Sequence, residues 1–116
     1  MNALKTHMKE KIESFGFSCS SDNKWIREDK VEQAGAQIII NGQKYQQKGE
    51  THDIKKEFSI MYETEIVTPE TGKTDKCIMC GFKIHDNNNI VQDMEINIYP
   101  GEFDFFEDLC KKLFNL

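Results

Sequence analysis

Several kinds of segment are missing from this chain of 116 residues. Only two prolines and seven glycines are present, which leaves little room for a flexible linker. No apolar run approaches the roughly 20 residues of a membrane-spanning helix, and the N-terminal residues lack the apolar stretch of a signal peptide. We therefore expect a cytoplasmic protein that forms one domain, residues 1–116.

The cysteines do not have the spacing of a disulfide framework. Cys19, Cys77, Cys80 and Cys110 are scattered along the chain, and cysteines of cytoplasmic proteins stay reduced. A chain of this length buries about two-thirds of its unfolded surface, so its core requires neither disulfides nor a metal for stability. The apolar content of 38% and the charged content of 30% are typical of an ordered globular chain.

Basic residues are absent from a long stretch near the C-terminus. Residues 61–116 carry eleven acidic and five basic side chains, and between Ile84 and Cys110 there are seven acids and no Lys or Arg. Binding to the phosphates of nucleic acids requires clustered positive charge. This distribution argues against direct contact with a nucleic-acid backbone, and we expect no membrane partner.

The patterns that are present are those of an α+β domain. Apolar residues repeat with helical spacing over residues 3–15 and again over residues 102–114. Between them, alternating patterns predict about six antiparallel strands, arranged as hairpins followed by a three-strand meander. Each helix has a single apolar stripe, so we expect both helices to pack on one face of the sheet. Residues 28–30 and 48–53 have the composition of polar loops.

The strongest hairpin signal is Asn41-Gly42. Both residues favour the positive φ angles of a two-residue turn, which would pair Ile40 with Gln43 and Ile38 with Tyr45. The surrounding residues are rich in glutamine and weakly charged. An edge hairpin of this kind can add a strand to another chain, so an oligomer through this hairpin is an alternative to an ordinary exposed hairpin.

One segment allows two interpretations. Cys77, Cys80 and His85 have a spacing that resembles the first three ligands of a CCHC zinc knuckle, whose fourth position is Ile90 here. In a strand, however, Cys77 and Cys80 point to opposite faces, and Cys80 shares an apolar stripe with Phe82. A shared zinc ion would need a tight turn instead. We therefore expect no metal, and a zinc-binding module is the alternative.

The acidic C-terminal half is the best candidate for a binding surface. Asp93 and Glu95 fall on the polar face of the last predicted strand, and aromatic residues lie near acids in the chain, as suits a basic protein partner. In size and charge alone, the chain is similar to small acidic proteins with which phages and mobile elements block host factors. The predicted partner-binding residues are Asp93, Glu95, Tyr99, Asp104, Phe105 and Asp108.

No catalytic motif surrounds any of the three histidines, His7, His52 and His85. Catalytic pairs can be assembled from distant segments, so an enzyme or a small-ligand protein, such as a nucleotide binder, is a further alternative. The sequence favours a small non-catalytic binding protein without a cofactor and indicates no catalytic residue.

Overall fold

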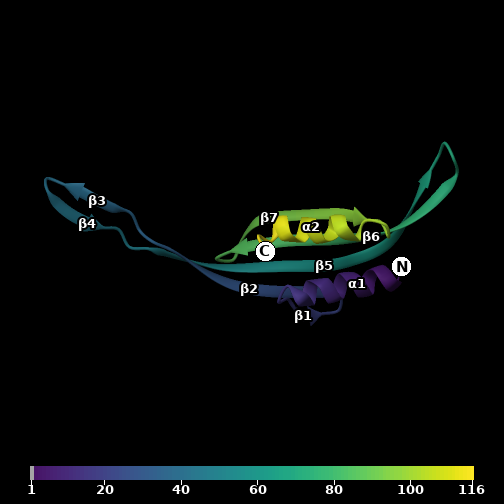
Figure 1. Cartoon of the computed structure of the whole chain (residues 1–116), viewed down its shortest axis with the longest axis horizontal. Helices are drawn as coiled ribbons and strands as arrows, with labels where there is room; N and C mark the ends of the chain where they lie inside the picture. The colour runs from purple at the N-terminus through teal and green to yellow at the C-terminus, as the bar shows by residue number, and fades with distance from the viewer. Residues whose placement is uncertain (1) are drawn as a thin grey trace.

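Two helices and seven strands make up the computed structural model, which describes residues 2–116, with side chains from Ala3 onward. The elements are α1 (Asn2–Ser14), β1 (Ser18–Ser21), β2 (Lys24–Gln33), β3 (Gln37–Ile40), β4 (Gln43–Gln46), β5 (Glu50–Thr68), β6 (Lys73–Asp86), β7 (Asn89–Ile98) and α2 (Phe103–Leu113). The main sheet is antiparallel with the order β1-β2-β5-β6-β7, while β3 and β4 pair separately (Figure 1). The predicted α+β fold with a helix at each end is confirmed.

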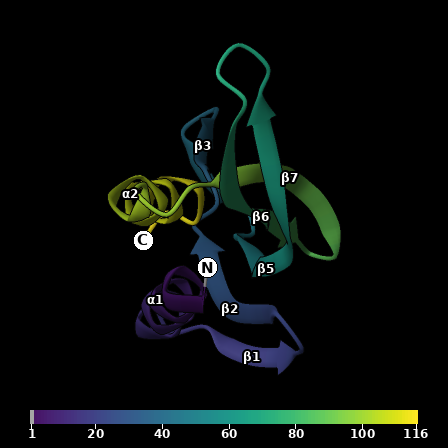
Figure 2. The ribbon, with the colours of Figure 1, turned by 90° about the vertical axis from the view of Figure 1, so that its right-hand side faces the viewer.

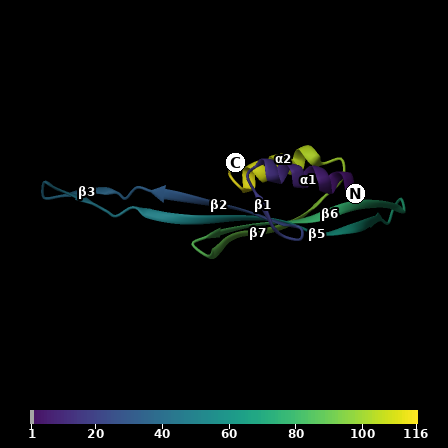
Figure 3. The same ribbon diagram turned by 90° about the horizontal axis from the view of Figure 1, so that it is seen from below.

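Both helices lie on the same face of the sheet, as expected (Figure 3). Figures 1 and 2 place α1 over the β1–β2 side and α2 over the β6–β7 side. Helical spacing explains which residues face inward: α1 buries a stripe four residues apart that includes Met8 and Ile12, and α2 buries Phe106 and Cys110. We call this helix-covered part of the sheet the body.

Aromatic rings fill the centre of the body. The ring of Phe58 on β5 lies 5.7 Å from that of Trp25, 5.4 Å from that of Phe82 and 5.5 Å from that of Phe106. These three rings come from two further strands and from α2, so Phe58 contacts both the sheet and the helix that covers it. Burying each large side chain contributes about 1.5–3 kcal/mol.

The sheet extends beyond the helices at both ends (Figures 1 and 3). The molecule measures 74 × 31 × 22 Å, and its radius of gyration is 19.9 Å, against about 13 Å for a compact chain of this length. We call residues 34–49, which contain β3 and β4, the first arm. The second arm is the distal end of the β5–β6 hairpin, residues 62–76.

The first arm has the predicted turn and pairing. Asn41 and Gly42 both have positive φ angles, of 50° and 79°, and Ile38 pairs with Tyr45. Two three-residue connectors join this hairpin to β2 and β5. The chain passes so closely there that a Cβ atom on Gly35 would lie 2.0 Å from the carbonyl oxygen of Gln47, which only glycine avoids.

Two predicted loops are wrong. Residues 28–30 belong to β2, where Glu28 pairs with Lys55, and β5 already begins at Glu50. This strand forms without apolar alternation because its backbone pairs with that of β5, and Lys56 Nζ lies 3.0 Å from Asp29 Oδ2 across the pair. In addition, a bulge at Met61 shifts the register of β5, which places Tyr62 opposite Met79 on the face that the helices leave uncovered.

Candidate functional site

The face of the sheet opposite the helices, here the bare face, carries a charged cluster around Glu57. Lys24 Nζ lies 2.7 Å and His85 Nε2 3.5 Å from the carboxylate oxygens of Glu57, whose exposed fraction is 9%. Burial alone would raise the pKa of Glu57, but the hydrogen bonds and charges of its basic neighbours outweigh burial and lower it. The cluster is therefore internally paired.

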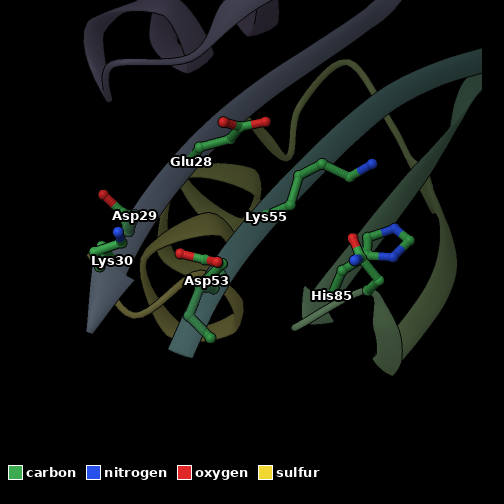
Figure 4. A pocket seen from close by; sticks show the side chains of 8 residues that line it. Glu28, Asp29, Lys30, Asp53, Lys55 and His85 are labelled. Carbon is green, nitrogen blue, oxygen red and sulfur yellow. The ribbon is translucent and has the colours of Figure 1, made fainter. Parts of the chain in front are cut away.

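A hollow of about 420 Å³ lies beside this cluster, close to the first arm (Figure 4). Its charged side chains have both signs and are spread along the hollow in Figure 4, without pointing at a common centre. Sites for small ligands instead use a few converging polar groups in an apolar pocket. The lining residues include Glu28, Lys30, Asp53, Lys55 and His85.

The three residues of the zinc-knuckle spacing do not come together. Cys80 is buried in the core under the helices, whereas Cys77 is three positions earlier in a regular strand and faces the other way. His85 is eight residues from Cys77, about 27 Å along an extended strand. Within residues 2–116, no group of three or more His, Cys, Asp or Glu side chains is placed to hold a metal ion.

The cysteines of the body are held as thiols. Burial raises the pKa of Cys80, and it raises the pKa of Cys110 to about 12. Burial also raises the pKa of Cys77, and the negative charges of Asp75 and Glu102 add to this effect. Metal ligation and nucleophilic attack both need the thiolate, which these surroundings disfavour.

The predicted acidic surface is divided between two sides of the sheet. Asp93 and Glu95 lie on the bare face, because Met94 between them pairs with Phe82 on the covered face. Asp104 and Asp108 are exposed on α2, on the other side of the sheet. Tyr99 follows the end of β7, where partial burial raises the pKa of its phenol and Cys77 lies nearby.

The bare face and the helix-covered face of the sheet meet at β7, which is an edge strand. Within residues 2–116, its outer side has no strand beside it, and a row of backbone N–H and C=O groups faces outward. Ile90, Val91 and Met94 are 57%, 61% and 38% exposed. This strand of ten residues therefore combines an open edge, apolar side chains and two carboxylates.

The sixth predicted residue, Phe105, borders this edge. Phe103 and Glu107 face α1, since they contact His7 and Lys11. Phe105 lies between them in sequence, on roughly the opposite side of a helix with 3.6 residues per turn. As α2 covers the β7 side of the sheet, the ring of Phe105 lies on the outer flank, where it is 44% exposed.

Sequence reasoning missed the apolar character of the first arm. Ile38, Ile39, Ile40 and Tyr45 are 39%, 65%, 54% and 49% exposed, although such side chains usually fill a core. The run of three isoleucines was visible in the sequence. Its exposure follows from the length of β2 and β5, which carry the hairpin away from the helices.

Comparisons with known protein families, with curated proteins and with solved structures gave no match for this chain. Among residues 2–116, neither helix is long and apolar enough to cross a membrane.

Proposed function

We propose that this chain is a small non-catalytic binding protein that holds an extended, basic segment of a protein partner along the edge of β7. The observation that carries the proposal is the open edge itself, which is apolar and acidic at once. In strand addition, backbone hydrogen bonds of the edge give affinity, and side chains on alternating positions give specificity.

The side chains around β7 define the partner's chemistry. Asp93 and Glu95 would attract Lys or Arg side chains that approach the open edge on the bare face. Lys83 lies opposite Asp93 on the inner side of β7, while β7 itself carries no base. On the covered face, Phe105 and Met94 offer apolar contact. A segment that alternates basic and apolar residues fits both faces. If the chain acts as an inhibitor of a host factor, it would bind that factor at the same edge of β7.

Selection from a library of random linear peptides on the immobilised protein tests this function. We expect enriched peptides to alternate Lys or Arg with apolar residues, and their binding to weaken as salt is added. The double variant Asp93→Lys/Glu95→Lys should lose them.

The matched control is Asp104→Lys/Asp108→Lys, which makes the same charge change on the outer surface of α2. This control should retain binding. The proposal fails if the protein, immobilised at low density so that copies do not contact one another, enriches no peptides, or if peptides bind equally well after reversal of Asp93 and Glu95.

A further inference from the structure

The first arm is a two-stranded hairpin with the composition of an interface. A hairpin of two strands is at best marginally stable in water unless it packs against something. Here Ile38 and Tyr45 pair across the strands on one face, and both are exposed, as are Ile39 and Ile40. These side chains would be stabilised if another surface covered them.

The charge of the first arm is opposite to that of β7. Residues 34–49 contain Lys44 and Lys48 and no acid, while residues 89–98 contain Asp93 and Glu95 and no base. The first arm is therefore the kind of basic and apolar segment that the edge of β7 would bind.

The outline of the sheet provides a place for such a segment. Strand β6 pairs with β5 only from Ile54 onward, so residues 43–50 run on toward the tip of the first arm without β6 beside them. The β6–β7 turn stops at the base of the arm, where the Asn87 N–H donates to the Asp53 carbonyl, 3.0 Å away. The sheet thus narrows by two strands at this step (Figure 1).

A second copy fits this step. Strands β5, β6 and β7 alternate in direction and β4 leads into β5, so β4 and β7 of one chain run the same way. A two-fold axis perpendicular to the sheet reverses the partner strand, which makes β4 of one copy antiparallel to β7 of the other. The same axis keeps the helices of both copies on one side of the joined sheet.

We infer that two copies of this chain form a closed dimer in which the hairpin of each adds through β4 to the edge of β7 of the other. This inference rests on the proposed function, because it names the partner of the same edge. Lys44 and Lys48 of one copy meet the acidic stretch of the other, and Phe105 lies against the added hairpin. Two identical contacts close the assembly, so neither β7 edge stays open.

The mass in solution, measured by sedimentation velocity over about a hundredfold range of concentration, tests the dimer. We expect twice the 13.5 kDa of one chain at the upper end. Tyr45→Glu places a charge on β4, the strand that pairs with β7 of the other copy, and should sediment as a monomer with unchanged circular dichroism. The matched control Val67→Glu changes a residue that is 57% exposed on the second arm, and it should remain a dimer.

Exchanging the charges of the first arm and of β7 tests whether these two segments face each other in the dimer. Lys44→Glu/Lys48→Glu and Asp93→Lys/Glu95→Lys should each raise the dissociation constant about tenfold or more, and combining them in one chain should restore the dimer. A dimer that survives Tyr45→Glu, or that Val67→Glu breaks, would overturn the inference. So would a combined variant that is no tighter than either parent.

Failure of the dimer can be separated from failure of the proposed function. If the chain is monomeric throughout and still binds basic peptides through Asp93 and Glu95, the second copy is the wrong partner and the function stands. If it is monomeric and binds no such peptide, both proposals fail.

Discussion

The body and the first arm use the same residue type in opposite ways. Ile12, Ile78 and Ile98 are completely buried between the helices and the sheet, whereas Ile39 and Ile40 on the first arm are 65% and 54% exposed. The difference arises from the layers: the body has helices on its sheet, and the first arm has none (Figure 3). The body therefore buries its apolar side chains, while those of the first arm stay exposed.

The largest difference in stability between a change in the body and a change in the first arm is expected for Phe58. Phe58→Ala would remove a fully buried ring that contacts three other aromatic rings, so it should lower the free energy of unfolding by about 3–5 kcal/mol. Ile39→Ala on the first arm should change it by no more than about 0.5 kcal/mol. Urea unfolding of both variants measures the difference, and equal effects would show that the first arm belongs to the core.

A smaller effect is expected from matched changes of two cysteines. Cys80→Ser would place a hydroxyl in the apolar core and should cost about 1–3 kcal/mol. Cys19→Ser, on the exposed strand β1, should be nearly neutral. Thiol labelling of the wild type offers a second readout, because only Cys19 should react quickly. Fast labelling of all four cysteines would contradict the buried positions.

Gly35→Ala should separate the first arm from the body. A Cβ atom would collide with the backbone at Gln47, so the connector must move and the hairpin should lose its ordered amide signals by NMR. The stability of the body should change by about 0.5 kcal/mol or less. Gly101→Ala adds a Cβ atom into open space and should leave the hairpin signals unchanged. An unaltered hairpin in Gly35→Ala would contradict the close approach.

The smallest effect concerns pH at the base of the first arm. His52 Nδ1 lies 2.9 Å from Asp86 Oδ1, and the hydrogen bond and charge of Asp86 raise the pKa of His52. Because this pKa is raised, the contact between His52 and Asp86 stabilises the fold fully at pH values below the ordinary histidine pKa, about 6.5. That stabilisation is lost as the pH rises through the raised pKa.

Asp86→Asn should therefore flatten the dependence of the urea midpoint on pH between about 6 and 8. Glu50→Gln removes the weaker neighbour, whose oxygen is 3.3 Å from His52 Nε2, and should flatten it less. If the urea midpoint of Asp86→Asn depends on pH as strongly as that of the wild type, the contact between His52 and Asp86 does not make stability depend on pH.

Local signals in the sequence were enough to predict the helices, one strand of the body and the turn of the first arm. The helices follow from apolar residues three and four apart, and the turn of the first arm follows from Asn41-Gly42, because these patterns act over short distances. The stripe that contains Cys80 and Phe82 also predicted a strand there, now β6, and with it the separation of Cys77 from Cys80.

What the sequence did not reveal depends on pairing between distant segments. Glu28 lies in a strand because the backbone of β2 pairs with that of β5 there, and the bulge at Met61 exists only in the register between β5 and β6. Likewise, the division of Asp93 from Asp104 required knowing which face the helices cover. The open edge of β7 is a property of strand order, which no single segment encodes.

Hydrogen exchange at low and at high protein concentration tests the contrast between body and arm most directly. Amides of β5 and β6 in the body should be protected at both concentrations, because the core does not depend on a partner. Amides of residues 37–46, and the amides of β7 that face away from β6, should exchange quickly in the dilute sample and gain protection together in the concentrated one. Exchange of the hairpin and β7 that is the same at both concentrations would contradict this account.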